Sequence, residues 1–431
     1  MKLNYRRTFL VGLAFMAISA FWQMYDTVIP LMLRNIFGIK DTASGVIMAL
    51  DNVLALFMLP IFGMLSDKAG RRIPFIVCGT FVAVASCMLI PVAGASKSFV
   101  LFFAALAVLL LSMGTFRSPA VALMPDVTPK PLRSKGNAVI NLMGTVGGIY
   151  TLIMIKLLIK ENANAADVNY LPIFIAVASL MAICAIVLSA AVNERKLKAE
   201  TDAVNDALDA ENDELSGGTN ERSGGKLPGP MLRSLMLILV SVFLWYMGYN
   251  AVTTAYSKYA TSVWGMELGN ASLCLVIAQV GALAAFLPIG IISSKIGRKR
   301  MIITGVVTLA LCFGVMAFAK TFSAWMFVVF VLIGFAWAAI NVNSFPMVVE
   351  ISRSGDIGKY TGYYYTFSMA AQIITPVLSG ALLEHVGYHT LLPYASLMAG
   401  AAVVTMAFVR HGDSKPVPSK SRLESFDVDM D

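Results

Sequence analysis

The decapeptide GMLSDKAGRR, Gly63 to Arg72, stands between two long apolar runs, and a near-copy, GIISSKIGRK, Gly290 to Lys299, follows later in the chain. One constant shift takes Gly63, Gly70 and Arg71 onto Gly290, Gly297 and Arg298. The same shift takes Pro119 onto Pro346. A turn that recurs together with its surroundings indicates an internal duplication. The sequence therefore predicts two repeats of the same topology, each with its charged turn between its second and third helix.

The composition is that of a membrane protein. Of the 431 residues, 58% are hydrophobic and only 13% are charged, whereas soluble domains carry about 25% charged residues. All five cysteines lie in apolar runs without the spacing of metal ligands: Cys78, Cys87, Cys184, Cys274 and Cys312. They are interpreted as small apolar side chains, which excludes a disulfide framework and a zinc site. We expect an integral membrane protein.

Twelve apolar runs are long enough to span a bilayer, which takes about 20 residues. They cover residues 9–33, 44–65, 73–95, 98–124, 134–160, 170–192, 231–256, 270–292, 301–319, 323–349, 360–383 and 388–409. The first run is too long for the apolar region of a signal peptide and lacks an obvious cleavage site. The chain is therefore predicted to be an all-α protein with twelve transmembrane helices in two six-helix repeats.

The basic residues predict the orientation of the chain. If the N-terminus is cytoplasmic, the inner loops and tails receive 25 of the 33 Lys and Arg residues. The outer loops receive seven, Lys156 and Lys258 among them, and Arg117 lies inside the fourth span. This asymmetry follows the positive-inside rule, so both termini are expected in the cytoplasm and the protein in the cell membrane. Because the positive charge is spread along one membrane face, it does not indicate nucleic-acid binding.

The predicted domains follow from the longest connection. Residues 193–230 carry nine of the 25 acidic residues and end in Gly, Ser and Pro. This composition is typical of a solvated, flexible linker, and a regulatory docking site is the alternative. We expect an N-terminal six-helix bundle over 1–192, a cytoplasmic acidic flexible linker over 193–230, a C-terminal bundle over 231–409 and a cytoplasmic tail over 410–431.

The charged turn itself suggests a conformational latch made of Gly63, Asp67, Gly70, Arg71 and Arg72. Glycines permit a tight connection, and the Asp67 carboxylate can accept hydrogen bonds at a helix N-terminus. The two arginines can hold that carboxylate or reach lipid phosphates. The alternative is a set of ordinary cationic anchors, which we favour for Lys295, Lys299 and Arg300. Because Ser294 replaces the acid in the second copy, only the first copy is expected to latch fully.

The pattern GxxxDxxGRR between helices two and three, with a weaker copy between helices eight and nine, resembles the major facilitator superfamily over nearly the whole chain. This resemblance implies a transporter that works by alternating access, in which the turn latches the halves while the cavity faces outward. SDKAGRRIPFI (Ser66–Ile76), RSPAVALMPD (Arg117–Asp126) and RSKGNAVINLMGTVGG (Arg133–Gly148) are similar to its sucrose and glycoside (glycoside-pentoside-hexuronide-like) symporter branch. That branch carries a functional arginine two residues after the Pro of helix four, where this chain has Val121. Arg117 lies one turn earlier, so its role is inferred from this sequence alone.

Polar residues within the spans predict a wet interior. Charged and amide side chains are costly in a membrane and usually face a cavity or a partner. Helices three, six, nine and twelve contain none in their interiors and are expected to face lipid, while the other eight surround a cavity. Amides interleaved with aromatic rings suit a sugar, although each lone amide could instead bond a neighbouring helix. The predicted substrate-binding residues are Gln23, Asn137, Asn141, Tyr246, Asn250, Gln279, Trp337, Asn341, Asn343, Tyr364 and Gln372.

Three ionisable residues are predicted to couple transport to protons. At about 1.5 Å per residue, Asp26 on helix one and Asp51 on helix two reach similar depth in the outer half of the membrane. Two buried carboxylates that repel each other favour a shared proton, which one of them can load and release. Arg117 lies nearer the inner side and could attract substrate hydroxyls or promote proton release. The alternative is structural, with Asp26 paired to Lys156 and Asp51 bonded near Asn52.

The sequence therefore predicts a proton-coupled symporter for a small polar solute, a sugar or glycoside, with sodium as the other possible coupling ion. The alternatives are an efflux antiporter for lipophilic or cationic compounds and a nutrient sensor that does not transport. An enzyme is not expected, because the three histidines lie in loops or the tail and no nucleotide-binding or metalloprotease motif is present. No cofactor or metal is expected. The expected partners are the substrate and the lipid bilayer, and the chain is expected to be monomeric.

Overall fold

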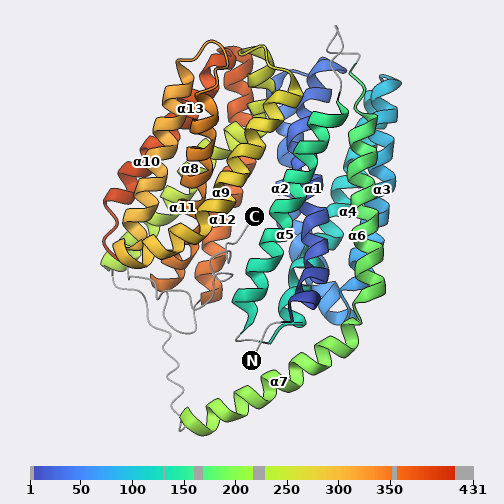
Figure 1. Ribbon diagram of the computed structural model, residues 1–431, viewed down its shortest axis with the longest axis vertical. Helices are drawn as coiled ribbons and strands as arrows, with labels where there is room; N and C mark the ends of the chain where they lie inside the picture. Colours follow the sequence, from blue (N-terminus) through green and yellow to red (C-terminus); the bar gives the residue numbers. More distant parts are fainter. Residues whose placement is uncertain (1–3, 130–131, 160–167, 217–228, 352–356, 413–431) are drawn as a thin grey trace. The chain divides into compact units, whose positions relative to one another are not determined.

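The computed structural model describes residues 4–129, 132–159, 168–216, 229–351 and 357–412 (Figure 1). Over these ranges the regular structure is helical, without a strand. The first half contains α1 (Tyr5–Asn35), α2 (Asp41–Ala69), α3 (Ile73–Ala95), α4 (Phe99–Asp126), α5 (Arg133–Leu158) and α6 (Leu171–Ala191). The helix α7 (Glu194–Ser216) comes next. The second half contains α8 (Gly229–Ser262), α9 (Leu268–Ile296), α10 (Arg298–Ala317), α11 (Met326–Ile351), α12 (Ile357–His385), the short η3 (Tyr388–Thr390) and α13 (Leu391–Ala407).

Twelve of the described helices are long and apolar enough to cross a membrane, and they match the twelve predicted spans one for one. The all-α fold class with twelve membrane-spanning helices is therefore confirmed. The remaining helix, α7, occupies a segment that the composition predicts to be flexible. The local sequence explains why this segment is helical. Ala, Leu and Glu favour a helix, and the apolar residues recur at helical spacing.

Contacts between Cα atoms divide the chain into two compact units whose borders differ from the predicted halves. One unit consists of Met1–Gln23, Val53–Thr151 and Asn169–Arg222. The other consists of Met24–Asn52, Leu152–Val168 and Ser223–Asp431. The second unit therefore takes in one end of α1, α2 and α5 together with all the helices of the second repeat. Within the first unit, α3 packs against both α4 and α6.

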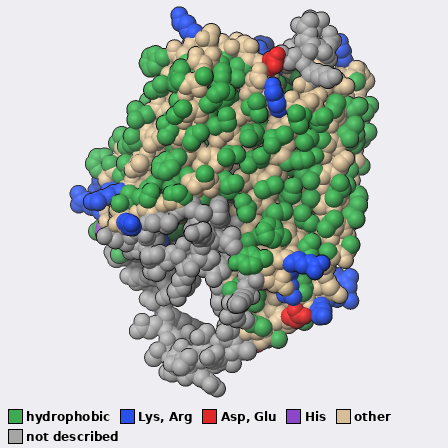
Figure 2. Space-filling view, viewed as in Figure 1, with side chains coloured by type: hydrophobic (Ala, Val, Ile, Leu, Met, Phe, Trp, Pro, Cys, Tyr) green, Lys and Arg blue, Asp and Glu red, His purple; other side chains and the backbone are tan. Residues whose placement is uncertain are grey.

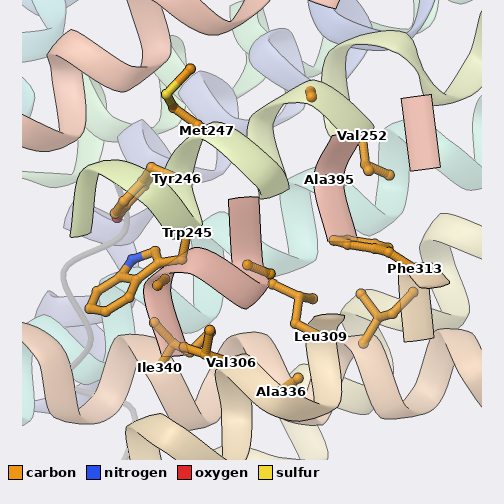
Figure 3. Packing of buried hydrophobic residues seen from close by; sticks show 14 of the residues in the cluster. Trp245, Tyr246, Met247, Val252, Val306, Leu309, Phe313, Ala336, Ile340 and Ala395 are labelled. Atoms are coloured by element: carbon orange, nitrogen blue, oxygen red, sulfur yellow. The ribbon is translucent and has the colours of Figure 1, made fainter. Parts of the chain in front are cut away.

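The second unit is built around α8, which packs against α12 and α13, while α11 packs against α9 and α10. Its core is a continuous group of buried apolar side chains, part of which is drawn in Figure 3. Trp245 on α8 is fully buried and lies among the side chains of Val306, Leu309 and Ile340 (Figure 3). Since lipid is as apolar as these side chains, close packing is what holds such helices together in a membrane.

The surface agrees with a lipid environment. On the face shown in Figure 2, hydrophobic side chains cover the middle and basic side chains gather toward the two ends. The four helices predicted to face lipid expose large apolar residues such as Val82 on α3 and Leu397 on α13. Exposure is not confined to them, because Phe57 on α2 and Val328 on α11 are exposed as well.

Both copies of the charged turn place a glycine with a positive φ directly after a helix. Gly70 follows α2 with a φ of 64° and Gly297 separates α9 from α10 with a φ of 95°. Only glycine adopts such positive angles without strain. The glycine that recurs between the repeats is therefore required by the backbone of the turn in both copies.

The structure corrects the prediction for Lys258. The composition suggests that the seventh span ends near residue 256, which leaves Lys258 in an outer loop. In the structure α8 continues to Ser262, and only 4% of Lys258 is exposed. The helix can include this lysine because its ammonium group lies 2.9 Å from the carboxylate of Asp41.

Candidate functional site

The two predicted coupling carboxylates belong to the same compact unit. Asp26 on α1 and Asp51 on α2 are both part-buried and close enough to act on each other electrostatically. The hydroxyl of Tyr25 lies 3.4 Å from the carbonyl oxygens of Ile47 and Met48, which holds α1 against α2 at this point. Two acids that repel each other favour a state with a single negative charge. The pair can therefore hold one proton between two sites.

The structure also tests the alternative partners of these acids. The side-chain nitrogen of Asn52 donates a 2.8 Å hydrogen bond to Asp51. Lys156, the alternative partner of Asp26, instead donates a 2.6 Å hydrogen bond to Asn270 on α9. The Asn52 contact stabilises the charged form of Asp51, which makes Asp26 the better candidate for the protonated member.

Arg117 on α4 lies over the indole ring of Trp22 on α1, with 5.7 Å between the guanidinium carbon and the ring centroid. A cation in this position is attracted to the negative face of the ring. Both residues belong to the first compact unit, and this contact joins α4 to α1 within it. Gln23, the next residue of α1, is part-buried.

Four residues of the second unit, Tyr246, Tyr249, Asn250 and Trp337, form what we call the aromatic–amide cluster. Tyr249 on α8 stacks on Trp337 of α11 with 3.5 Å between the ring centroids and an angle of 4°. Tyr246 meets the same indole edge to face, with 5.5 Å between centroids. The amide nitrogen of Asn250 is buried and has no hydrogen-bond partner among the described residues.

An unsatisfied buried donor costs about 1–3 kcal/mol. The amide nitrogen of Asn250 is therefore a donor that is available to an acceptor from outside the protein. Tyr249 directly precedes Asn250 on α8, and Trp337, the ring that stacks on Tyr249, comes from α11. Apolar rings, together with an amide donor on the same helix as Tyr249, can bind a small polar molecule that has both hydroxyl groups and an apolar face.

Several predicted binding residues have internal roles. Asn343 is buried and its amide donates to the carbonyl of Ala339 on its own helix, and Asn341 bonds Trp337 in the same way. The hydroxyl of Tyr364 lies 2.9 Å from that of Ser344, and both residues are buried. The bonds of Asn341 and Asn343 lie within α11, and only the Tyr364 contact joins two helices, α11 and α12. The bond from Asn341 leaves its side-chain oxygen available.

The remaining predicted amide residues lie in both compact units. Gln279 on α9 and Gln372 on α12 are part-buried in the second unit. Asn141 on α5 is buried in the first unit. The side chain of Asn137 lies outside the described residues. For these four residues, a role in binding stays a prediction.

The charged turn is organised around Arg72, which is buried, and not around Arg71. The guanidinium of Arg72 donates to Asp126 at 2.9 Å, to Asp67, to the hydroxyl of Ser66 and to the carbonyl of Gly63. Burial lowers the pKa of Arg72, but the bonds and charges of Asp126 and Asp67 outweigh it and raise that pKa above its ordinary value. Asp67 therefore has the predicted ionic contact, and Arg72 keeps its charge.

A second acid reaches this turn from the linker. The carboxylate of Glu194, the first residue of α7, accepts hydrogen bonds from the backbone N–H groups of Arg72 and, at 3.0 Å, Ile73. These N–H groups belong to the start of α3, where the helix itself supplies no acceptor. Farther along α7, Glu200 forms an ion pair with Arg7 of α1 at 2.9 Å. The linker helix is thus attached to α1 and α3.

Sequence reasoning missed Tyr249, Asp126, Glu194 and Lys258. Tyr249 lies next to Asn250 and Asp126 ends one of the quoted stretches, so proximity to predicted residues was an available signal. Glu194 and Lys258 carry no such signal, because their partners are far away in the chain. Within the described part of the chain, no three His, Cys, Asp or Glu side chains gather in a way that could hold a metal ion.

Comparisons with known proteins agree with this architecture. The family model described as Major Facilitator Superfamily matches residues 11–216 and 238–427. No curated protein gives a significant match. Among solved structures, a mutant of the nucleoside transporter NupG is similar with a TM-score of 0.70 and 13% identity, over 94% of this chain and 99% of that one.

Two further solved structures show the same fold. The POT family transporter PepTSo aligns with a TM-score of 0.69 at 10% identity, over 95% of this chain and 98% of that one. A bacterial homologue of the human lysosomal transporter Spinster, in an inward-facing and occupied conformation, aligns with a TM-score of 0.61 at 15% identity, over 95% of each chain. At such identities the likeness shows the fold alone.

Proposed function

Because the chain belongs to the major facilitator superfamily and is a transporter rather than an enzyme, we propose that it moves a sugar or glycoside together with protons. The observation that carries the coupling is the pair Asp26 and Asp51, two part-buried acids in membrane-spanning helices that act on each other electrostatically. Ionisable residues within such helices are rare and mark ion pathways and proton relays. We assign the proton to this pair, with Asp26 as its main carrier.

The aromatic–amide cluster supports the choice of substrate. A sugar presents hydroxyl groups at its edge and C–H groups on its faces, so it suits an amide donor beside stacked rings. The buried amide nitrogen of Asn250 supplies the donor, and Tyr249 and Trp337 supply the rings. The cluster has no acidic member, which disfavours a cationic substrate. Both termini are proposed to face the cytoplasm, with the monomer in the cell membrane.

Uptake by reconstituted vesicles tests this proposal directly. We expect an inward proton gradient to drive accumulation of a neutral mono- or disaccharide, and a protonophore to abolish it. A panel with a nucleoside, a dipeptide and a cationic dye, each with and without a sodium gradient, covers the other solutes. Expulsion of the dye would support an efflux antiporter instead. Binding of a sugar without accumulation would support a sensor.

Replacing Asn250 by leucine is expected to raise the KM for the transported sugar about 10-fold, because loss of a buried hydrogen bond costs about 1–3 kcal/mol. The maximal rate should change less, since Asn250 is not a member of the proton-carrying pair. Initial rates over a range of sugar concentrations measure both quantities. The matched control is Val82→Thr on the exposed face of α3, which should leave the KM unchanged. Equal losses in the two variants would contradict the assignment.

A further inference from the structure

A buried group of polar side chains joins the two repeats where α2 begins. We call it the Asp41 cluster, and it consists of Asp41 and Ser44 on α2, Lys258 on α8 and Tyr388 on η3. The ammonium of Lys258 donates to the Asp41 carboxylate at 2.9 Å and to the Ser44 hydroxyl at 3.0 Å. The Tyr388 hydroxyl donates to the other oxygen of that carboxylate. All four residues belong to the second compact unit.

The burial of the two charges makes each dependent on the other. Only 5% of the Lys258 side chain and 9% of the Asp41 side chain are exposed. A charge within a membrane-spanning helix is costly unless a partner compensates it. Removing one member of such a pair leaves the other uncompensated and strongly disfavours the buried arrangement. The contact is therefore weakened when either charge is removed, while Tyr388 still donates to Asp41 and Arg34 lies over the Tyr388 ring, 4.8 Å from its centroid.

The backbones of α2 and α12 approach each other beside the cluster. A Cβ atom on Gly45 would lie 2.0 Å from the carbonyl oxygen of Pro376, and one on Gly380 would lie 2.4 Å from that of Asp41. Neither position leaves room for a side chain. The backbone N–H of Thr42 also donates to Glu384 of α12 at 3.0 Å. We call this contact of α2 with α12 the seam between the repeats. It is closely packed at the end where the Asp41 cluster lies.

Other polar contacts at helix ends in the same unit differ in exposure. The bond from Lys156 on α5 to Asn270 on α9 is exposed. The ion pair of Lys40 with Glu384 has 78% of the lysine side chain exposed. Water and salt screen such contacts, which are worth little. Of the contacts named here, only the Asp41 cluster loses its bound water when the seam closes and replaces it with hydrogen bonds to protein groups.

We propose that Asp41, Lys258 and Tyr388 are positioning residues that hold the seam closed at the end predicted to face outward. They would separate whenever the substrate enters or leaves on that side, so this inference rests on the proposed transport function. When the seam opens, both charges return to water. Their hydration offsets part of the free energy lost with the ion pair, so the open state stays accessible. A lone charge is tolerated only when hydrated, and therefore removing either partner shifts the population toward the open state.

The test is the outward accessibility of one cysteine, and it needs no substrate. Thr254, one helical turn from Lys258 on α8, is replaced by cysteine in a background without the five native cysteines. A membrane-impermeant maleimide is then applied to right-side-out vesicles. We expect Asp41→Asn and Lys258→Met each to raise the labelling rate at least about fivefold, the lower range of allosteric coupling. The exchanged pair, Asp41→Lys with Lys258→Asp, should return the rate toward the starting value.

Three further measurements separate this role from a merely structural one. Labelling in inside-out vesicles should stay constant or fall, whereas general loosening of the fold would raise labelling from both sides. Tyr388→Phe removes one hydroxyl, keeps the fold and should raise outward labelling by a smaller factor. Lys156→Ala, at the exposed contact, should change nothing. Single variants that label at the starting rate would overturn the proposal, as would an exchanged pair that labels as fast as they do.

The outcome of the labelling experiment does not depend on which solute is transported. If no sugar is accumulated while the labelling pattern is as expected, the substrate assignment fails and the closing contact holds. If sugar uptake is proton-driven while labelling is unchanged, the Asp41 cluster is a fixed structural contact and only this inference fails.

Discussion

Changing Asp26 to asparagine is expected to abolish uphill accumulation of the substrate while leaving its exchange at equilibrium intact. Asparagine has the size of aspartate and can still donate and accept hydrogen bonds, but it cannot take up and release a proton. Exchange needs only the movement of the loaded carrier, whereas accumulation needs a proton that travels with the substrate. The accumulation ratio should therefore fall to about one, because no free energy is drawn from the proton gradient.

The two assays are performed on the same vesicles. Gradient-driven uptake measures coupling, and exchange of labelled for unlabelled substrate measures the carrier without it. Glu267→Gln is the matched control, because Glu267 is an exposed carboxylate just before α9 and lies outside the pair. It should accumulate substrate like the unchanged protein.

Asp51 decides how the proton is shared. If the pair holds one proton between two sites, Asp51→Asn should weaken accumulation less than Asp26→Asn does, since Asn52 already stabilises the charged form of Asp51. Asp26→Glu should restore part of the coupling. Normal accumulation by both single variants and by the double variant would show that the pair does not couple transport.

The second large effect is expected at Arg72. Replacement by alanine removes the donor to Asp126, Asp67 and Ser66 at once and leaves Asp126, which is 23% exposed, without its partner. We expect a loss of about 2–4 kcal/mol of stability, because a part-buried charge stays uncompensated. Thermal unfolding of the purified protein in detergent, together with its expression level, measures this loss.

The neighbouring arginine provides the control. Arg71→Ala removes the same charge from the same turn, but Arg71 takes no part in the bonds to Asp126 and Asp67, so the loss should be small. Arg72→Lys should rescue little, since an ammonium cannot reproduce the fork of a guanidinium. If Arg71→Ala and Arg72→Ala destabilise equally, the network around Arg72 is not what stabilises the turn.

The two acids bound to Arg72 should differ in how much stability their replacement costs in the thermal-unfolding experiment. The Asp67 side chain is 62% exposed, whereas that of Asp126 is 23% exposed. Water screens the more exposed pair, so Asp126→Asn should cost more stability than Asp67→Asn. A role of Asp67 in latching the outward-facing state is a separate prediction, and a change in conformational population without a change in stability would be its signature.

The fold could be predicted from the sequence because it depends on properties that run along the chain. Apolar length predicts the spans, and the repeated glycines of the turn reflect the positive φ at Gly70 and Gly297. Similar depth of Asp26 and Asp51 in the membrane follows from their positions in helices of known rise, and both residues fall in the second compact unit.

Contacts between distant segments could not be predicted in this way. Lys258 looks like a loop residue until Asp41 is placed beside it, because burial of a lysine depends on its partner. Similarly, an amide in a helix suits a ligand or a neighbouring carbonyl equally well on chemical grounds. Only the structure shows that Asn343 bonds its own helix and that the amide nitrogen of Asn250 has no such partner among the described residues.

The bond from Glu194 to the start of α3 bears on how the chain is made. During synthesis the first six spans leave the ribosome before residue 194 does, so the N–H groups at the start of α3 wait for an acceptor that arrives last. The first half is then complete only when part of α7 has been added. A split version of the protein, expressed as two fragments, should therefore be divided after Ser216 and not at the end of α6. Glu194, which completes the hydrogen bonding of the first half, therefore belongs by its position in the chain to the linker.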